Sequence, residues 1–318
     1  MKIRELFNPA FIAAHVALVV LLVIVTSMPG QAETKDPVYF CIAILLIEVL
    51  FVVNQVMSLA KASKSKKKGL FNRYAGEVIC FLWIVLIAWD LVTAKFKLVG
   101  TVLFPPPENV FYVYAANWQE MLVNAGYSTG ILIVGFSIGT ALGIFLGLFV
   151  GWNPRLKSFF FPIARIMAPI PPMVYAPYVV ILLPAFELTS VTLIALAIFL
   201  CVFLSTIISV SQVNEHIIDS ARTLGVSGHK MVLQILLPSA LPAYVDSLKV
   251  NVIIAFMMLV FSETVGANFG MGHWIHLFTH YGDYAKTFAG IFEMAAVVLI
   301  VNVIVEKIQA KAIKWKAD

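Results

Sequence analysis

The chain alternates long apolar runs with short polar segments. The apolar runs reach about 20 residues, which is enough for a helix to cross a hydrocarbon core of about 30 Å. They lack the period-two alternation of barrel strands, and a helix satisfies its own backbone hydrogen bonds inside lipid. The pattern therefore predicts membrane-spanning helices near residues 10–28, 38–60, 77–94, 124–151, 158–184, 188–211, 243–265 and 284–306.

Composition excludes an ordinary soluble domain, because 61% of the residues are hydrophobic and only 12% are charged. The formal net charge of +5 is no sign of nucleic-acid binding here, since basic residues in a membrane protein mainly set the orientation of its loops. Cys41, Cys80 and Cys201 lie far apart within apolar runs. We expect them to be small hydrophobic residues of the core rather than disulfide partners or metal ligands.

Basic residues gather in every second loop, which predicts that both termini are cytoplasmic. The first span could instead be a cleaved signal peptide, because Gly30–Ala32 loosely resembles a cleavage site, and the later topology would be unchanged. The lysine-rich segment 61–68 orients a cytoplasmic loop, with lipid headgroup binding as a secondary interpretation. The basic positions are Lys2, Arg4, the segment 61–73, Arg155, Lys157, Arg222, Lys230, Lys307, Lys311, Lys314 and Lys316.

Two spans have features that predict their packing. The fourth carries a glycine at every fourth residue, a stripe that lets another helix backbone approach closely and that says nothing about a substrate. The fifth carries prolines that prevent one straight helix, so it either lines a pathway or is a kinked packing helix. The glycines are Gly135, Gly139, Gly143, Gly147 and Gly151, and the prolines are Pro162, Pro169, Pro171, Pro172, Pro177 and Pro184.

The segment between the sixth and seventh spans, residues 218–250, is amphipathic. Ser220, Ala221 and Leu224 can share a helical face, and Gly225 permits a turn. A second helical segment is expected from about residue 230 to 237 and to end at Pro238. This arrangement predicts a rigid knob suited to docking a cytoplasmic partner.

The same segment resembles the cytoplasmic loop of ABC importer permeases, whose signature is EAA, three residues, Gly, nine residues, Ile, one residue and Leu-Pro. Asp219, Ser220 and Ala221 stand in the place of EAA, with Asp for Glu and Ser for the first Ala. The remaining signature positions are filled, at the required spacing, by Gly225, Ile235, Leu237 and Pro238. From about residue 104 onward the chain is similar to permeases of the nitrate, sulfonate and taurine type, through Phe104–Pro107, Pro169–Pro172 and Glu263–Ala267.

The resemblance implies an all-α permease of the type I importer fold in a bacterial inner membrane. Its six-helix core would occupy residues 73–318, with the coupling loop at 214–242, and residues 1–72 would form a two-helix extension. The implied partners are a cytoplasmic ABC ATPase dimer, an extracytoplasmic solute-binding protein and a second copy or related permease, and the implied solute is a small anion. The chain has no GxxxxGK[ST] phosphate loop, so ATP hydrolysis would belong to the partner, and we expect neither a cofactor nor catalysis here.

Charged residues inside predicted spans are costly and mark pathways or pairs. Glu263 is the candidate for the translocation pathway together with Pro169, Pro171 and Pro172, whereas Glu48, Asp90 and Glu293 can equally pair across helices or reach an interface. A metal-ligand spacing occurs in His273, His276 and His280, but no carboxylate or cysteine joins them, so we expect no metal site. The alternative functions are an ion-coupled transporter or channel, which predicts inverted repeats that are not apparent, and a membrane scaffold.

Overall fold

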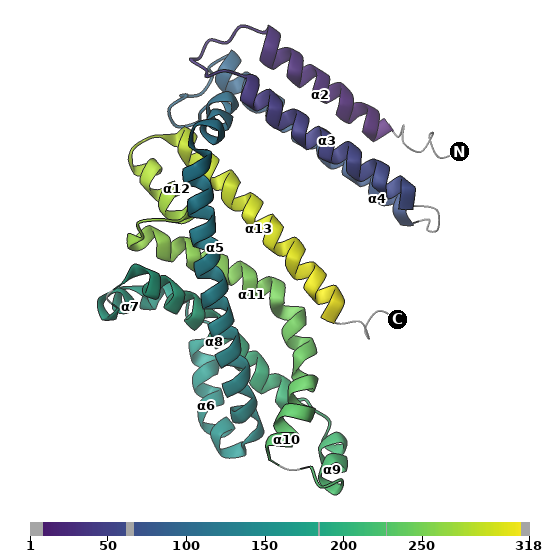
Figure 1. The fold of residues 1–318 in the computed structure, drawn as a ribbon, viewed down its shortest axis with the longest axis vertical. Coiled ribbons are helices and arrows are strands. Elements are labelled where there is room, and N and C mark those ends of the chain that lie inside the picture. The colour runs from purple at the N-terminus through teal and green to yellow at the C-terminus, as the bar shows by residue number, and fades with distance from the viewer. Residues whose placement is uncertain (1–8, 62–66, 184, 227, 313–318) are drawn as a thin grey trace. The chain divides into compact units, whose positions relative to one another are not determined.

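The computed structural model describes residues 9–61, 67–183, 185–226 and 228–312. Helices are the only regular elements among these residues, and seven of them are long and apolar enough to cross a membrane (Figure 1). A bent helix pair raises the number to eight. The chain is therefore an all-α polytopic membrane protein, as the apolar runs predict.

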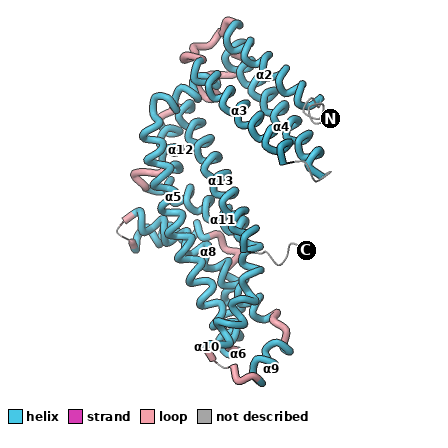
Figure 2. Tube along the Cα trace, turned by 45° about the vertical axis from the view of Figure 1, so that its right-hand side comes forward, coloured by secondary structure: helices cyan, strands magenta, loops and turns pink. Residues whose placement is uncertain are grey.

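Figure 2 shows helices joined by short loops. A π-helical segment follows α4 at Leu91–Lys95, another follows α10 at Val232–Leu236, and a 3-10 turn precedes α7 at Pro172–Tyr175. The helices are α2 (Pro9–Ser27), α3 (Val38–Lys61), α4 (Lys67–Asp90), α5 (Pro107–Trp152), α6 (Pro154–Met167), α7 (Ala176–Leu182), α8 (Phe186–Ser211), α9 (Glu215–Thr223), α10 (His229–Met231), α11 (Leu237–Gly266), α12 (Met271–His280) and α13 (Tyr284–Ala312).

The described residues form two compact units. The first contains the residues up to 119 together with 277–289, and the second contains 120–276 and the residues from 290 onward. The sequence-based boundary near residue 72 falls inside α4 and stays a prediction. The orientation of the termini also stays a prediction. Some of the basic residues on which that prediction rests lie outside the described residues. These are Lys2, Arg4, Lys64, Lys66, Lys314 and Lys316, and Pro184 lies outside them as well.

The spans predicted at 124–151 and 158–184 differ most from the observed helices. The helix expected at 124–151 already begins at Pro107, because residues 107–123 are helical but too polar to be recognised from hydropathy, and its dihedral angles depart from helical values at Asn117. The proline-rich span at 158–184 is broken into α6 and a second piece beginning at Pro172, with a bend of 91° between them. The break follows from the missing backbone donors of its prolines.

The expectation that a helix ends at Pro238 is wrong. The helix passes through this residue, and His229–Gly266 forms one span of 38 residues. The π-helical segment Val232–Leu236 widens the turn so that the Leu237 N–H bonds to the Val232 carbonyl. Pro238 then lies in the first turn of α11, where its missing N–H leaves no hydrogen bond broken.

The first unit is built around α2, which packs along α4. The buried residues of α2 are Ala14, Leu18, Leu21 and Val25, whose spacing of three and four places them on one face. They meet a core that includes Phe40 of α3 and Trp83 of α4, both fully buried. The opposite face of α2 exposes valines and isoleucine, as a helix surrounded by lipid tails would.

In the second unit, the glycine stripe of α5 faces α8. A methyl group added at Gly135, Gly139, Gly143, Gly147 or Gly151 would come within 2.5–2.9 Å of α8 atoms. These distances are shorter than any ordinary carbon contact, so only glycine permits this separation of the two backbones. A core of buried residues from α5, α8 and α11 surrounds the contact, including Ile194, Ile198, Val252 and Leu259.

We expect Gly139→Ala to lower the free energy of unfolding by about 1–3 kcal/mol, because its methyl group would overlap the Ala195 carbonyl oxygen at 2.5 Å. The matched control is Gly130→Ala on the same helix, where an added Cβ has no neighbour within 4 Å and a gain of up to about 1 kcal/mol in helix propensity is expected. Thermal unfolding of the purified protein in detergent compares the two. Equal unfolding midpoints would show that the close approach of α5 and α8 contributes nothing to stability.

Candidate functional site

The first signature residues of the amphipathic segment, Asp219 to Gly225, lie on α9 and the turn that follows it. Together with α10 these residues form what we call the coupling knob (residues 215–226 and 228–231). Asn214 caps α9 by accepting a hydrogen bond from the His216 N–H at 2.9 Å. At the other end Gly225 has φ of +78°, and the Val226 N–H bonds back to the Ala221 carbonyl at 3.0 Å. This glycine C-cap turns the chain sharply and ends α9.

The knob has one buried face and one exposed face. Ala221 is buried in a cluster that also contains Leu148 of α5, Val210 of α8 and Met231 of α10. Asp219, Ser220 and Leu224 are exposed, and Leu224 is 83% exposed at the tip. Leu224 therefore projects from the surface of the knob, close to the firmly packed Ala221.

The remaining signature residues lie where the knob joins α11. Ile235 and Leu237 are half-buried against the same cluster, and Pro238 is exposed. They therefore shape the root of the knob rather than its tip.

One contact of the knob involves residues outside the signature. The Arg222 guanidinium lies 5.7 Å from the centre of the Trp152 ring at the end of α5, and 3.3 Å from the Asp219 carboxylate. A cation over an aromatic ring is attracted to it, which links the exposed side of α9 to the glycine-striped helix. Because Trp152 and Arg222 are far apart in sequence, only the folded structure shows that they are in contact.

Glu263 lies in a second cluster of the same unit and is 1% exposed. Its Oε2 accepts a hydrogen bond from the Gly272 N–H at 2.7 Å, and its Oε1 accepts one from the Ser128 hydroxyl at 2.5 Å. The Ser128 oxygen accepts the Met271 N–H at 2.8 Å, and Asn124 Oδ1 accepts the Gly270 N–H at the same distance.

This cluster satisfies the N-terminal N–H groups of α12 with a carboxylate, which also complements the positive end of the helix dipole. A side chain at Gly270 or Gly272 would overlap the Glu263 carboxyl, since an added Cβ would lie 2.5 or 2.9 Å from it, and Gly270 has φ of +121°. Asn124 and Ser128 were not singled out from the sequence, although their i, i+4 spacing in an apolar run is a usable signal. The pathway role of Glu263 stays a prediction.

The proline candidates lie at the 91° bend between α6 and α7. Pro169 and Pro171 are exposed and Pro172 is half-buried. The Val174 N–H bonds to the Pro171 carbonyl at 3.0 Å, so the 3-10 turn uses one of the carbonyls released by the break. Their contact with a solute stays a prediction.

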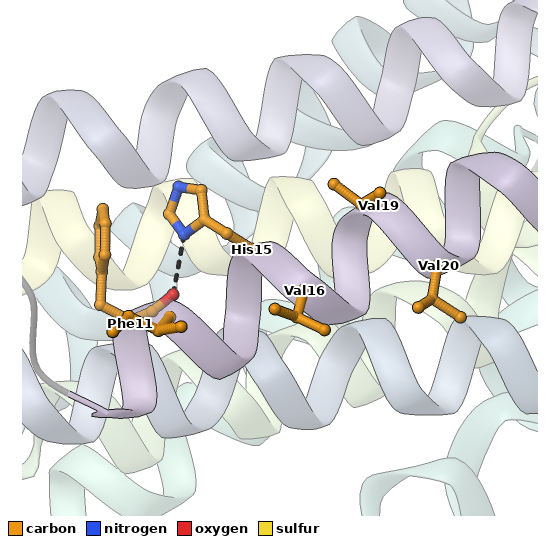
Figure 3. Close-up of a pocket in the computed structure, with 6 residues that line it drawn as sticks. Phe11, His15, Val16, Val19 and Val20 are labelled. Atoms are coloured by element: carbon orange, nitrogen blue, oxygen red, sulfur yellow. Dashed lines mark hydrogen bonds between the residues drawn. The ribbon is translucent and has the colours of Figure 1, made fainter.

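A hollow of about 460 Å³ runs along α2 in the first unit (Figure 3). It is lined by residues of this one helix, and only His15 among them is polar. The His15 Nδ1–H donates to the Phe11 carbonyl at 2.8 Å, and Nε2 lies 2.9 Å from Glu48 Oε1 on α3. An apolar face of a single helix suits lipid chains better than a polar solute. Glu48 thus pairs across helices.

No group of three or more His, Cys, Asp or Glu side chains is arranged to hold a metal ion in the part of the chain that the structure describes. His273 is partly buried, and burial together with nearby His276 lowers the pKa of its imidazole.

Comparison with known proteins gives a consistent family assignment. The profile of a family described as "Binding-protein-dependent transport system inner membrane component" matches residues 139–314. The chain is 26% identical over 248 residues to the taurine transport system permease protein of Escherichia coli (strain K12), covering 74% of this chain and 88% of that protein. It is 25% identical over 262 residues to a putative aliphatic sulfonates transport permease protein of Bacillus subtilis (strain 168), covering 80% and 93%.

A solved structure shares the fold. It is an inward-facing crystal form of the MetNI methionine ABC transporter, with a TM-score of 0.51 and 16% sequence identity, covering 62% of this chain and 98% of that chain. At this identity the likeness concerns the arrangement of helices alone.

We expect Ser128→Ala to lower the free energy of unfolding by about 1–3 kcal/mol, because it leaves the buried Met271 N–H without its acceptor. Ser262→Ala is the matched control, since Ser262 is also buried but bonds only to the Leu259 carbonyl within its own helix, and its loss should cost about 0.5 kcal/mol or less. Thermal unfolding of both variants measures the difference. Similar losses in the two variants would contradict the role of Ser128 in holding α12.

Proposed function

Because the chain belongs to the family of binding-protein-dependent transport system inner membrane components, whose profile covers more than half of its residues, we propose that its coupling knob docks a cytoplasmic ABC ATPase. The chain is a multi-pass membrane protein and the permease subunit of an ABC importer. Permeases of this family are not catalytic, and they work with ATPase and binding-protein partners. The proposal concerns how this chain meets those partners and what it carries.

The observation that carries the proposal is the division of the signature between two faces of the knob. Ala221 is buried, which keeps the knob rigid, whereas Asp219, Ser220 and Leu224 are exposed. Conformational change in a partner reaches a second protein efficiently only through a stiff element. The ATP is hydrolysed by the partner, because this chain lacks a phosphate loop.

The knob is positioned to pass motion into the membrane. Its second helix continues into α11 as one span, His229–Gly266, with Pro242 inside it. The path along the helix axis is about 57 Å at the α-helical rise of about 1.5 Å per residue. The far end of this span carries Glu263, which holds the N-terminus of α12. Closure of the ATPases would therefore tilt one continuous lever that ends at the Glu263 cluster.

In the complete importer, two permease subunits surround the translocation pathway, as a homodimer or with a related permease. We assign the bend at Pro169, Pro171 and Pro172 to the wall of that pathway, because a broken span leaves backbone carbonyls that can face a polar solute. Glu263 acts as its gate. Both termini and the coupling knob are cytoplasmic, and the binding protein delivers the solute on the opposite side.

The proposed solute is a small anion of the sulfonate, taurine or nitrate type. Support comes from the names of the relatives in Escherichia coli and Bacillus subtilis, which refer to taurine and to aliphatic sulfonates. The reconstituted importer should take up such an anion with ATP as its only energy source. Uptake driven by an ion gradient without ATP would instead identify a secondary transporter.

We expect Leu224→Asp to reduce permease-dependent ATP hydrolysis at least tenfold without unfolding the protein, because Leu224 is 83% exposed and a carboxylate would disturb an apolar contact with the ATPase. The matched control is Leu98→Asp, which places the same charge at another exposed leucine, 72% exposed, in the first unit. ATPase assays on the reconstituted complex measure both. Undiminished coupling in Leu224→Asp would remove Leu224 from the docking surface.

The turn at Gly225 provides a second prediction. An added Cβ at Gly225 has no neighbour within 4 Å, so substitution there acts only through the backbone, whose φ is +78°. Gly225→Val should distort the knob and lower coupled ATP hydrolysis, since a left-handed conformation costs an ordinary residue about 1–2 kcal/mol. Gly225→Asn, which tolerates this conformation, should retain most of the coupling, and equal loss in both variants would contradict a role for the turn.

A further inference from the structure

A buried cluster of charges in the first unit has no part in the proposed transport cycle. Asp90 ends α4 and is 0% exposed, Glu108 is the second residue of α5 and is 1% exposed, and Lys95 is 5% exposed. The cluster holds two carboxyl groups and one ammonium group. One positive charge is therefore missing from an environment where an unpaired charge is costly.

Lys95 cannot balance both carboxylates, because its single ammonium group mainly binds backbone carbonyls of α2. Its Nζ donates to the Val25 carbonyl at 3.2 Å and to the Met28 carbonyl at 3.1 Å. Its distance to Asp90 Oδ2 is 4.0 Å. Lys95 thus caps the C-terminal carbonyls of α2 and balances at most one carboxylate.

The two carboxyl groups lie within hydrogen-bonding reach of each other. Neither oxygen of Asp90, nor Oε2 of Glu108, has a donor among the described residues. Two carboxylates are both acceptors and repel at this separation, whereas one proton between them makes a strong charge-assisted hydrogen bond. Asp36, just before α3, and Cys41 on α3 are the other titratable groups that interact with this cluster, and neither adds a positive charge. Lys286 forms an ion pair with Asp283 at 3.7 Å.

We propose that Asp90 and Glu108 form a proton-binding site, in which one proton shared by the two carboxyl groups makes the cluster with Lys95 electrically neutral. The bound proton fastens the junction of α4, α5 and the C-terminus of α2. When alkaline pH removes it, the two carboxylates repel and the hold on α2 loosens. The site is independent of the coupling knob, so it stands whether or not the knob docks an ATPase.

Amide hydrogen exchange of α2 in the full-length protein, in lipid nanodiscs, tests the proposal. Wild type is compared with Asp90→Asn and with Glu108→Gln at the same pH, so that intrinsic exchange rates cancel. Either amide supplies the hydrogen bond permanently, so we expect α2 of wild type to exchange several-fold faster than α2 of the variants at pH 9, and at the same rate at pH 6. If α2 of wild type and of the variants exchanged at the same rate at pH 9 as well as at pH 6, the proposal would be overturned.

Further arms separate the alternatives. Glu33→Gln, which neutralises an exposed acid of the same unit, should behave like wild type, and a loss of pH dependence there would overturn the assignment to the buried pair. Sodium added at pH 9 should leave the exchange of α2 unchanged. Slower exchange in sodium would identify a sodium site instead of a proton site. If one variant does not fold, the other carries the same comparison. Infrared difference spectra, wild type minus folded variant at neutral pH, should show a protonated carboxyl band, and its absence would contradict a shared proton.

Discussion

The hydrocarbon core of a bilayer offers no hydrogen-bond partners to the backbone, and every break in a helix of this protein has to be satisfied from within. Some of its buried charged and polar residues lie at these breaks. Glu263 and Ser128 accept the first N–H groups of α12, and Lys95 donates to the last carbonyls of α2. An anion at a helix N-terminus and a cation at a C-terminus also match the helix dipole. Two buried charges, Glu263 and Lys95, are thus helix caps.

The same constraint shapes the helices of the second unit. Pro171 lies at an abrupt bend, whereas Pro238 directly follows a π-helical segment. The second helix of the knob therefore continues into α11, while the proline-rich span is divided. Glycines on α5 let α8 pack closely along it. In the transport cycle proposed above, the continuous span His229–Gly266 would act as the lever beside the broken span.

The first unit follows a different design. Its helices are joined by a few polar contacts inside an apolar surrounding: His15 with Glu48, and Lys95 with α2. Each contact links elements that are otherwise held by leucine, valine and aromatic packing. Polar contacts of this kind fix the register of helices whose apolar faces would tolerate sliding, since lipid and core are equally apolar.

The sequence by itself determined the helical class, most of the membrane spans and the family, because these depend on local hydropathy and on the fixed spacing of a short signature. It also identified the glycine face of α5, since a four-residue repeat is a property of one helix. It could not show that Pro238 lies inside a helix, because the compensating π-helical segment depends on packing around Val232 and Leu236. Nor could it show that Glu263 caps α12, that Trp152 meets Arg222, or that Asp90 faces Glu108. Those partners are distant in sequence, and only the tertiary structure brings the atoms within reach.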